Sequence, residues 1–93
     1  MSDEDREPVA VRRKRLRFRA WHRGTKEMDL LMGPFADDRI AGLDDGQLAE
    51  FEDLLAEPEP DVYAWIVGNA APPARLDGTV LHQIIDFHAA KHA

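Results

Sequence analysis

Apolar residues recur at intervals of three and four along five segments of this chain, and glycine or proline residues separate most of these segments. This interval places apolar side chains on one side of an α-helix. The pattern therefore predicts five helices, at residues 9–23, 25–41, 45–57, 62–67 and 78–91. Because the connections are short, we expect an all-α fold, a compact five-helix bundle in a single small domain.

Several helix ends carry recognisable signals. Thr25 is expected to cap the second helix, and the pair Gly33-Pro34 predicts a kink or break within it. Asp44, followed three residues later by a glutamine, resembles a capping box at the start of the third helix. Asp77 is expected to cap the fifth helix.

The length of 93 residues allows one hydrophobic core. We expect residues 1–7 to be a disordered acidic N-terminus and residues 8–93 to form the folded domain. No apolar run approaches the roughly 20 residues that span a bilayer, so membrane insertion is not expected. The chain has no cysteine, and its acidic start differs from secretory leaders and transit peptides, which favours a cytoplasmic location in a bacterium.

Positive charge is concentrated near the start of the chain. The net charge is −6, yet nine of the twelve lysine and arginine residues lie within residues 1–27. Arg12, Arg15, Arg19 and Arg23 fall within a stripe of about 80° on the first helix. The residues alone leave three interpretations open: an acidic protein or nucleotide cofactor as partner, a nucleic-acid interface, or a face that is solvated or paired within the molecule. The acidic remainder of the chain argues against nucleic acid.

Residues suited to catalysis or metal binding form no convincing group. His88 and His92 have the i, i+4 spacing of metal ligands, but no third ligand has a predictable position, so we expect a partly buried histidine or a partner contact at His88. No hydroxyl residue sits in a nucleophile motif, and no glycine-rich phosphate loop is present. We therefore expect no enzyme. Trp65 is expected in the core, and Tyr63 suits an interface.

Arg23 and Glu27 flank Gly24 at a tight junction between the first two helices. Glycine here would ease the turn and let another backbone approach closely. A salt bridge between the two charges would stabilise the fold by only about 0 to 1 kcal/mol if exposed. Recognition is therefore the favoured role of this junction.

At this junction the sequence resembles the small assembly factors of succinate dehydrogenase, the flavinylation factors whose signature is Arg-Gly-x-x-Glu. The signature here is Arg23-Gly24-Thr25-Lys26-Glu27. The resemblance extends over roughly residues 12–87 and includes the following matching positions: Arg12-Arg13-Lys14-Arg15-Leu16, Met28-Asp29, Pro34-Phe35, Leu43, Leu48, Phe51, Leu54-Leu55, Asp61 and Trp65. The sequence departs from the family pattern at Trp21-His22 and at Gly33.

The resemblance implies a five-helix protein that binds the flavoprotein subunit of succinate dehydrogenase, with the subunit of fumarate reductase as a second candidate. It also implies that the factor promotes covalent attachment of FAD, through its 8α-methyl carbon, to a histidine of that subunit. The FAD belongs to the partner, and this chain is expected to bind no cofactor tightly.

The same resemblance assigns residues to the partner-binding surface. Arg23, Gly24 and Glu27 are placed at its centre by the motif. Arg15, Arg19 and Asp29 are expected to be their neighbours. The competing hypothesis is a nucleic-acid-binding or antitoxin-like regulatory protein that would use the arginine stripe.

Overall fold

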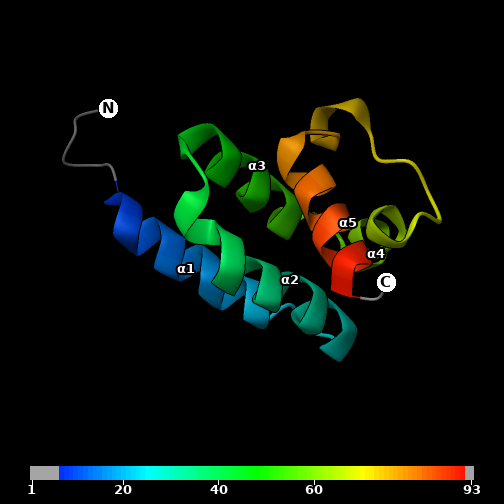
Figure 1. Cartoon of the computed structure of the whole chain (residues 1–93), viewed down its shortest axis with the longest axis horizontal. Coiled ribbons are helices and arrows are strands. Elements are labelled where there is room, and N and C mark those ends of the chain that lie inside the picture. Colours follow the sequence, from blue (N-terminus) through cyan, green and yellow to red (C-terminus); the bar gives the residue numbers. More distant parts are fainter. Residues whose placement is uncertain (1–6, 92–93) are drawn as a thin grey trace.

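The first two helices lie side by side as an antiparallel pair, and the third helix runs along the same side of the molecule beside them (Figure 1). The structure is a computed structural model that describes residues 7–91. The described residues form five α-helices and two short 3-10 helices, without a β-strand: α1 Val9–Trp21, α2 Lys26–Arg39, η2 Ile40–Gly42, α3 Asp45–Ala56, α4 Glu59–Val67, η3 Ala74–Leu76 and α5 Thr79–Lys91. The predicted all-α, five-helix fold is confirmed.

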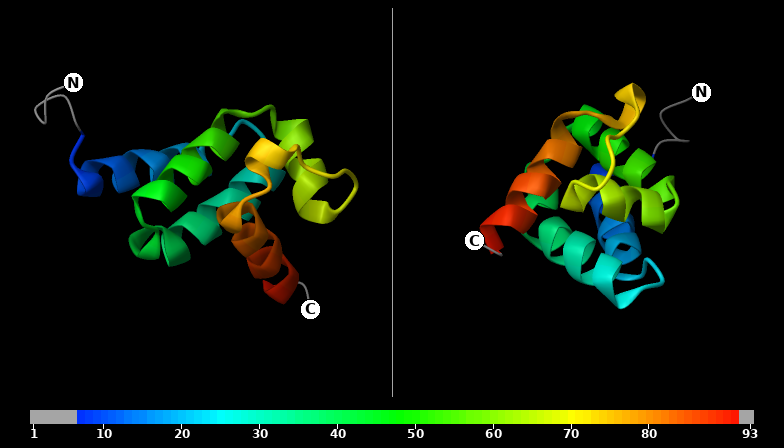
Figure 2. Two further views of the ribbon diagram at one scale, coloured as in Figure 1. Left: turned by 90° about the horizontal axis from the view of Figure 1, so that it is seen from above. Right: turned by 90° about the vertical axis from the view of Figure 1, so that its right-hand side faces the viewer.

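The core lies between the α1–α2 pair and the three later helices. α5 packs against α2, α3 and α4, and α4 closes the end of the molecule where α1 turns into α2 (Figure 2). Phe35 of α2 occupies the middle, with its ring centroid 5.8 Å from that of Phe51 and 5.7 Å from that of Phe87. Trp65 is 9% exposed and belongs to this core, as expected.

The connection between α1 and α2 begins earlier than expected. α1 ends at Trp21, two residues before the predicted end, because the chain there is held by contacts outside the helix. The backbone N–H of Arg23 donates to Oδ1 of Asp29 at 2.6 Å. Thr25 caps α2 as predicted, with its Oγ1 accepting the backbone N–H of Met28 at 3.4 Å.

The Gly33-Pro34 pair does not break α2, contrary to one of the alternatives we expected. The helix continues through both residues to Arg39, although proline removes one backbone hydrogen-bond donor. Gly33 is buried under the indole ring of Trp21, and a Cβ at this position would come within 2.3 Å of the ring. α1 and α2 are therefore in close contact at Gly33, where α2 remains continuous.

Of two further helix caps predicted from the sequence, one is present in the structure and one is not. The capping box at the start of α3 is confirmed: Asp44 Oδ1 accepts the Gln47 backbone N–H at 2.8 Å, and the Gln47 side chain accepts the Asp44 backbone N–H. The fifth helix is present and ends at Lys91 as predicted, but the prediction that Asp77 caps it is wrong, because α5 begins two residues after Asp77. A carboxylate oxygen of Glu50, from α3, instead accepts the backbone N–H of Val80 at 3.3 Å.

None of the helices formed by residues 7–91 has the length and apolar character needed to cross a bilayer. Most of the segment predicted to be a disordered acidic start, residues 1–6, lies outside the described residues, as does His92. Glu7 is the one described member of that segment, and its carboxylate contacts Arg15.

Candidate functional site

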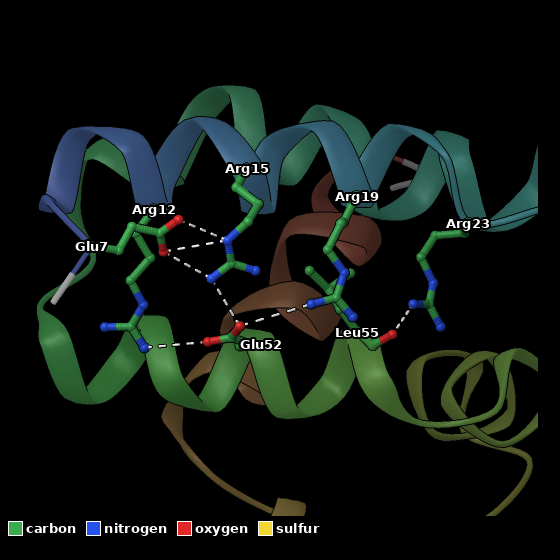
Figure 3. A network of polar contacts seen from close by, with 7 residues as sticks. All are labelled: Glu7, Arg12, Arg15, Arg19, Arg23, Glu52 and Leu55. Carbon is green, nitrogen blue, oxygen red and sulfur yellow. Dashed lines mark hydrogen bonds and ion pairs between the residues drawn. The ribbon is translucent and has the colours of Figure 1, made fainter. Parts of the chain in front are cut away.

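The arginine of the Arg-Gly-x-x-Glu motif points into the protein. The Arg23 guanidinium donates a hydrogen bond to the backbone carbonyl of Leu55 (Figure 3). It donates a second one to the backbone carbonyl of Glu57, at 2.9 Å. These groups lie at the C-terminal end of α3, where carbonyls lack partners within the helix and favour a cation. Only 9% of the Arg23 side chain is exposed, and this burial lowers the pKa of its guanidinium, an effect that the nearby Glu59 charge opposes.

Arg23 also faces a carboxylate from α4. Its Nε lies 3.8 Å from Oε1 of Glu59, the first residue of that helix. Both atoms are buried, and neither has a hydrogen-bond partner among the described residues. The motif arginine therefore joins three parts of the fold: the α1–α2 connection, the end of α3 and the start of α4.

Gly24 is required by its backbone conformation. Its φ is +117°, in a region that L-residues with a side chain rarely adopt. A Cβ built at Gly24 would lie 3.5 Å from Oε1 of Glu59, which is an ordinary contact distance. The conformational freedom we expected of this glycine is therefore used, whereas the space beside it would admit a small side chain.

Two acidic residues near the motif have different roles. Asp29 is partly buried, and its carboxylate holds the Arg23 backbone N–H, so it helps to fix the connection. Glu27 is exposed, and no residue in the described part of the chain pairs with its carboxylate. Of the charged residues on this corner, Glu27 and its neighbour Lys26 are exposed and have no partner among the described residues.

A surface hollow of about 340 Å³ opens beside the motif, between the start of α2 and the start of α4. Its lining combines acidic and apolar side chains: Thr25, Glu27, Met28, Glu59, Pro60 and Tyr63. Tyr63 is 40% exposed, in keeping with the interface role that its sequence position suggested. We name this feature the α2–α4 hollow.

The sequence analysis did not connect α4 with the Arg-Gly-x-x-Glu motif. Glu59 and Pro60 precede the fourth helix as predicted, residues 62–67, and they lie more than 30 residues from the motif. In the structure α4 already begins at Glu59. The acidic first turn of α4 is the one signal that hinted at a charged surface there. No spacing rule connects that turn with Arg23.

The other members of the arginine stripe converge on a single glutamate of α3 (Figure 3). Arg15 Nη2 lies 2.9 Å from Glu52 Oε2, Arg12 Nη2 lies 3.5 Å from Oε1, and Arg19 Nη1 lies 3.9 Å from Oε2. Arg15 also donates to Glu7 through two nitrogens. Hydrogen bonds to Glu7 and Glu52 raise the pKa of Arg15, and the hydrogen bond from Arg15 lowers the pKa of Glu7.

The arginine stripe is thus paired within the molecule, one of the three interpretations that the sequence left open. A nucleic-acid interface along this stripe loses its basis, because its guanidinium groups already face α3. Arg15 and Arg19 keep 39% and 36% of their side chains exposed. Their contact with a partner, like that of Glu27, stays a prediction.

The histidines offer no obvious alternative site. His88 is half-buried on α5, as expected. His82 contacts Asp77, with Nε2 2.6 Å from Oδ1, at an exposed position. Within residues 7–91, no three histidine, aspartate or glutamate side chains gather closely enough to hold a metal ion.

Comparison with known proteins finds one matching family and several similar proteins. Residues 14–88 match the family described as "Flavinator of succinate dehydrogenase". The mitochondrial "succinate dehydrogenase assembly factor 2" of Cryptococcus neoformans is 37% identical over 87 residues, covering 94% of this chain and 50% of that protein. The protein of the same name from Dictyostelium discoideum is 37% identical over 76 residues, covering 82% of this chain and 53% of its own length.

A bacterial relative is matched over more of its length. The "FAD assembly factor SdhE" of Acetobacter pasteurianus is 33% identical over 78 residues, which cover 84% of this chain and 72% of that protein. The chain spans about half the length of the two mitochondrial relatives. The family match covers most of the described fold, including the motif and the whole α2–α4 hollow. The chain therefore belongs to the succinate dehydrogenase flavinator family.

Proposed function

We propose that this chain binds the flavoprotein subunit of succinate dehydrogenase and promotes covalent attachment of FAD to that subunit. The observation that carries this proposal is the family match over residues 14–88, within which the motif borders a surface hollow. The names of the relatives, a succinate dehydrogenase assembly factor and an FAD assembly factor, support the same role. We propose the flavoprotein subunit of fumarate reductase as a second candidate partner.

In this proposal the chain acts by binding and carries out no flavin chemistry of its own. FAD stays with the partner, and the attachment reaction uses the partner's residues. A small protein promotes such a step when it binds the attachment-competent conformation of the partner more tightly than the other conformations. To move that conformation from 1% to 99% of the population, its preference must be about 10⁴-fold.

Some residues of the motif and its surroundings hold the fold together, whereas others are exposed to a partner. Arg23, Asp29 and Gly24 fix the α1–α2 connection against α3 and α4. Glu27 and Tyr63 remain exposed on the resulting surface. A rigid corner of this kind limits the conformational entropy lost on binding.

The test is co-expression of the flavoprotein subunit with and without this chain. We expect the two proteins to co-purify, and flavin fluorescence to remain on the denatured subunit only when the chain is present. The fumarate reductase subunit, tested in parallel, decides between the two partners. If neither co-purification nor covalent flavin depends on the chain, while the chain binds nucleic acid in a salt-dependent way, the regulatory-protein hypothesis replaces this one.

A pair of variants at Gly24 tests whether the motif is the contact surface. Gly24→Ala and Gly24→Arg both place a side chain at a φ of +117°, so they share a backbone strain of about 1 to 3 kcal/mol. Only the arginine adds a long side chain at the corner. We expect both variants to fold and Gly24→Arg alone to lose the partner. Equal binding by the two folded variants would place the contact elsewhere.

A cytoplasmic location remains a prediction, because the relatives include both mitochondrial proteins and a protein from the bacterium Acetobacter pasteurianus. Fractionation of the native cell, followed by detection of this chain with an antibody, decides the compartment.

A further inference from the structure

We propose that the α2–α4 hollow receives one basic side chain, an arginine or lysine, of the flavoprotein subunit, and that Glu27 and Glu59 hold its charged group. This inference rests on the proposed function and adds the chemistry of recognition to it. It starts from the unusual combination of features in the hollow: two carboxylates beside an aromatic ring and apolar walls.

The carboxylates have unused capacity to accept hydrogen bonds. The Glu27 carboxylate has no partner among the described residues. Oε1 of Glu59 is buried and faces Arg23 Nε at 3.8 Å, while its other oxygen, Oε2, has no hydrogen bond or ion pair with a described residue. A carboxylate has about four lone-pair sites, and a guanidinium offers five N–H donors while an ammonium offers three. A cation from the partner would supply donors to both glutamates.

The walls of the hollow suit the stem of a long basic side chain. Met28 and Pro60 provide apolar surface, and the ring of Tyr63 borders the same space. Arginine and lysine bury their methylene groups against such surfaces while the charged end remains near polar groups. An aromatic ring also attracts a cation over its face. The volume of about 340 Å³ is near the lower limit for ligand pockets, which favours a single side chain as the occupant.

An anion is the less suitable occupant, even though two helices begin here. Helix N-termini attract anions through free backbone N–H groups. In α4, however, Pro60 has no N–H, and in α2 the Thr25 side chain already accepts the Met28 N–H. The charge of Arg23 is directed at the carbonyls of α3 and at Glu59. The two glutamates would therefore repel an anion, and no lysine or arginine is among the residues that line the hollow.

The experiment compares Glu27→Gln with Asp45→Asn in binding to the purified flavoprotein subunit. Both substitutions remove one exposed, unpaired carboxylate from the first turn of a helix. Asp45 lies at the start of α3 and is not among the residues that line the hollow. The pair is therefore matched in charge and in helix position, and differs in whether the residue lines the hollow.

We expect Glu27→Gln to weaken binding about tenfold, because a hydrogen-bonded ion pair is lost, and Asp45→Asn to change it less than twofold. The salt dependence of binding should also decrease for Glu27→Gln alone. Equal affinities for the two variants, with wild-type binding intact, would overturn this inference and leave the proposed function standing. Tighter binding by Glu27→Gln would indicate an anionic occupant and also overturn it. Absence of wild-type binding would overturn both proposals.

Discussion

Replacing Arg23 with alanine is expected to destabilise the fold, since this motif residue is mostly buried. Its guanidinium donates to the Leu55 and Glu57 carbonyls and faces the Glu59 carboxylate, and 9% of the side chain is exposed. The substitution removes both hydrogen bonds and leaves Glu59 without its cation. Arg23 therefore differs from a surface arginine that only contacts a partner.

The magnitude follows from these contacts. Hydrogen bonds that involve a charged group contribute about 1.5 to 3 kcal/mol each. Water reaches the end of α3 once the side chain is removed, and it recovers part of this energy. We therefore expect a loss of about 2 to 4 kcal/mol, from a total that for a domain of this length is about 5 to 14 kcal/mol.

Urea denaturation followed by circular dichroism measures this loss. With an m-value of about 1 kcal/mol per molar urea, the midpoint should fall by about 2 to 4 M. Arg19→Ala is the control, because Arg19 belongs to the same stripe but is 36% exposed and 3.9 Å from Glu52. Its loss should stay below about 0.5 kcal/mol. If Arg23→Ala were no more destabilising than Arg19→Ala, the structural role of Arg23 would be refuted.

Two other predictions concern packing and pH. Gly33→Ala should lower the melting temperature, because its Cβ would lie 2.3 Å from the Trp21 ring, and overpacking costs about 1 to 3 kcal/mol against a helix-propensity gain of about 1 kcal/mol. In a Trp21→Leu background the same change should be neutral or stabilising, and an unchanged loss there would contradict the packing argument. Because Arg15 lowers the pKa of Glu7 in the folded state, Glu7→Gln should be less stable than wild type at neutral pH. That difference should vanish as the pH falls from the usual glutamate pKa through the lowered one, and its persistence in acid would argue against the ion pair.

The helices could be predicted because their signals are local. The Asp44 capping box involves residues three positions apart, and apolar periodicity identifies the buried face of each helix. The errors occurred where distant residues decide the outcome. α1 ends early where Arg23 reaches α3, and α5 begins at a site held by Glu50, also from α3. Neither contact has a sequence spacing that predicts it.

The arginine stripe illustrates the same limit. Helical spacing correctly placed Arg12, Arg15 and Arg19 on one face of α1, whereas Arg23 lies in the connection after that helix. The sequence did not show which element this face would meet. Glu52, which collects three of the arginines, lies 33 to 40 positions away. Pairing across that distance converts an expected cationic surface into an internal contact between α1 and α3.

The structure accounts for two departures from the family pattern together. Trp21 and Gly33 each looked unusual in the sequence, and they contact each other in the fold. The absence of a side chain at Gly33 makes room for the indole, whose Nε1 donates to Asp37 at 3.1 Å. Trp21 and Gly33 are therefore explained by each other, and neither is explained by its own position in the sequence.

The site was predicted in part. The motif lies at the corner where the α2–α4 hollow opens, and Tyr63, an interface candidate from the sequence, lines that hollow. Contact of this corner with a partner stays a prediction. The sequence could not show which residues of the motif are buried and which are exposed. Burial of Arg23 and exposure of Glu27 depend on the positions of α3 and α4 in the fold. The α2–α4 hollow joins segments more than 30 residues apart, so only the folded chain reveals it.

Whether this chain promotes covalent attachment of FAD can be measured directly with purified components. The flavoprotein subunit, prepared without covalent flavin, is mixed with FAD in the presence or absence of this chain, and the FAD that remains on the denatured subunit is measured over time. We expect the chain to accelerate covalent attachment, and Glu27→Gln to require about tenfold more protein than wild type for the same acceleration. An attachment rate that is the same with and without the wild-type chain would contradict this expectation.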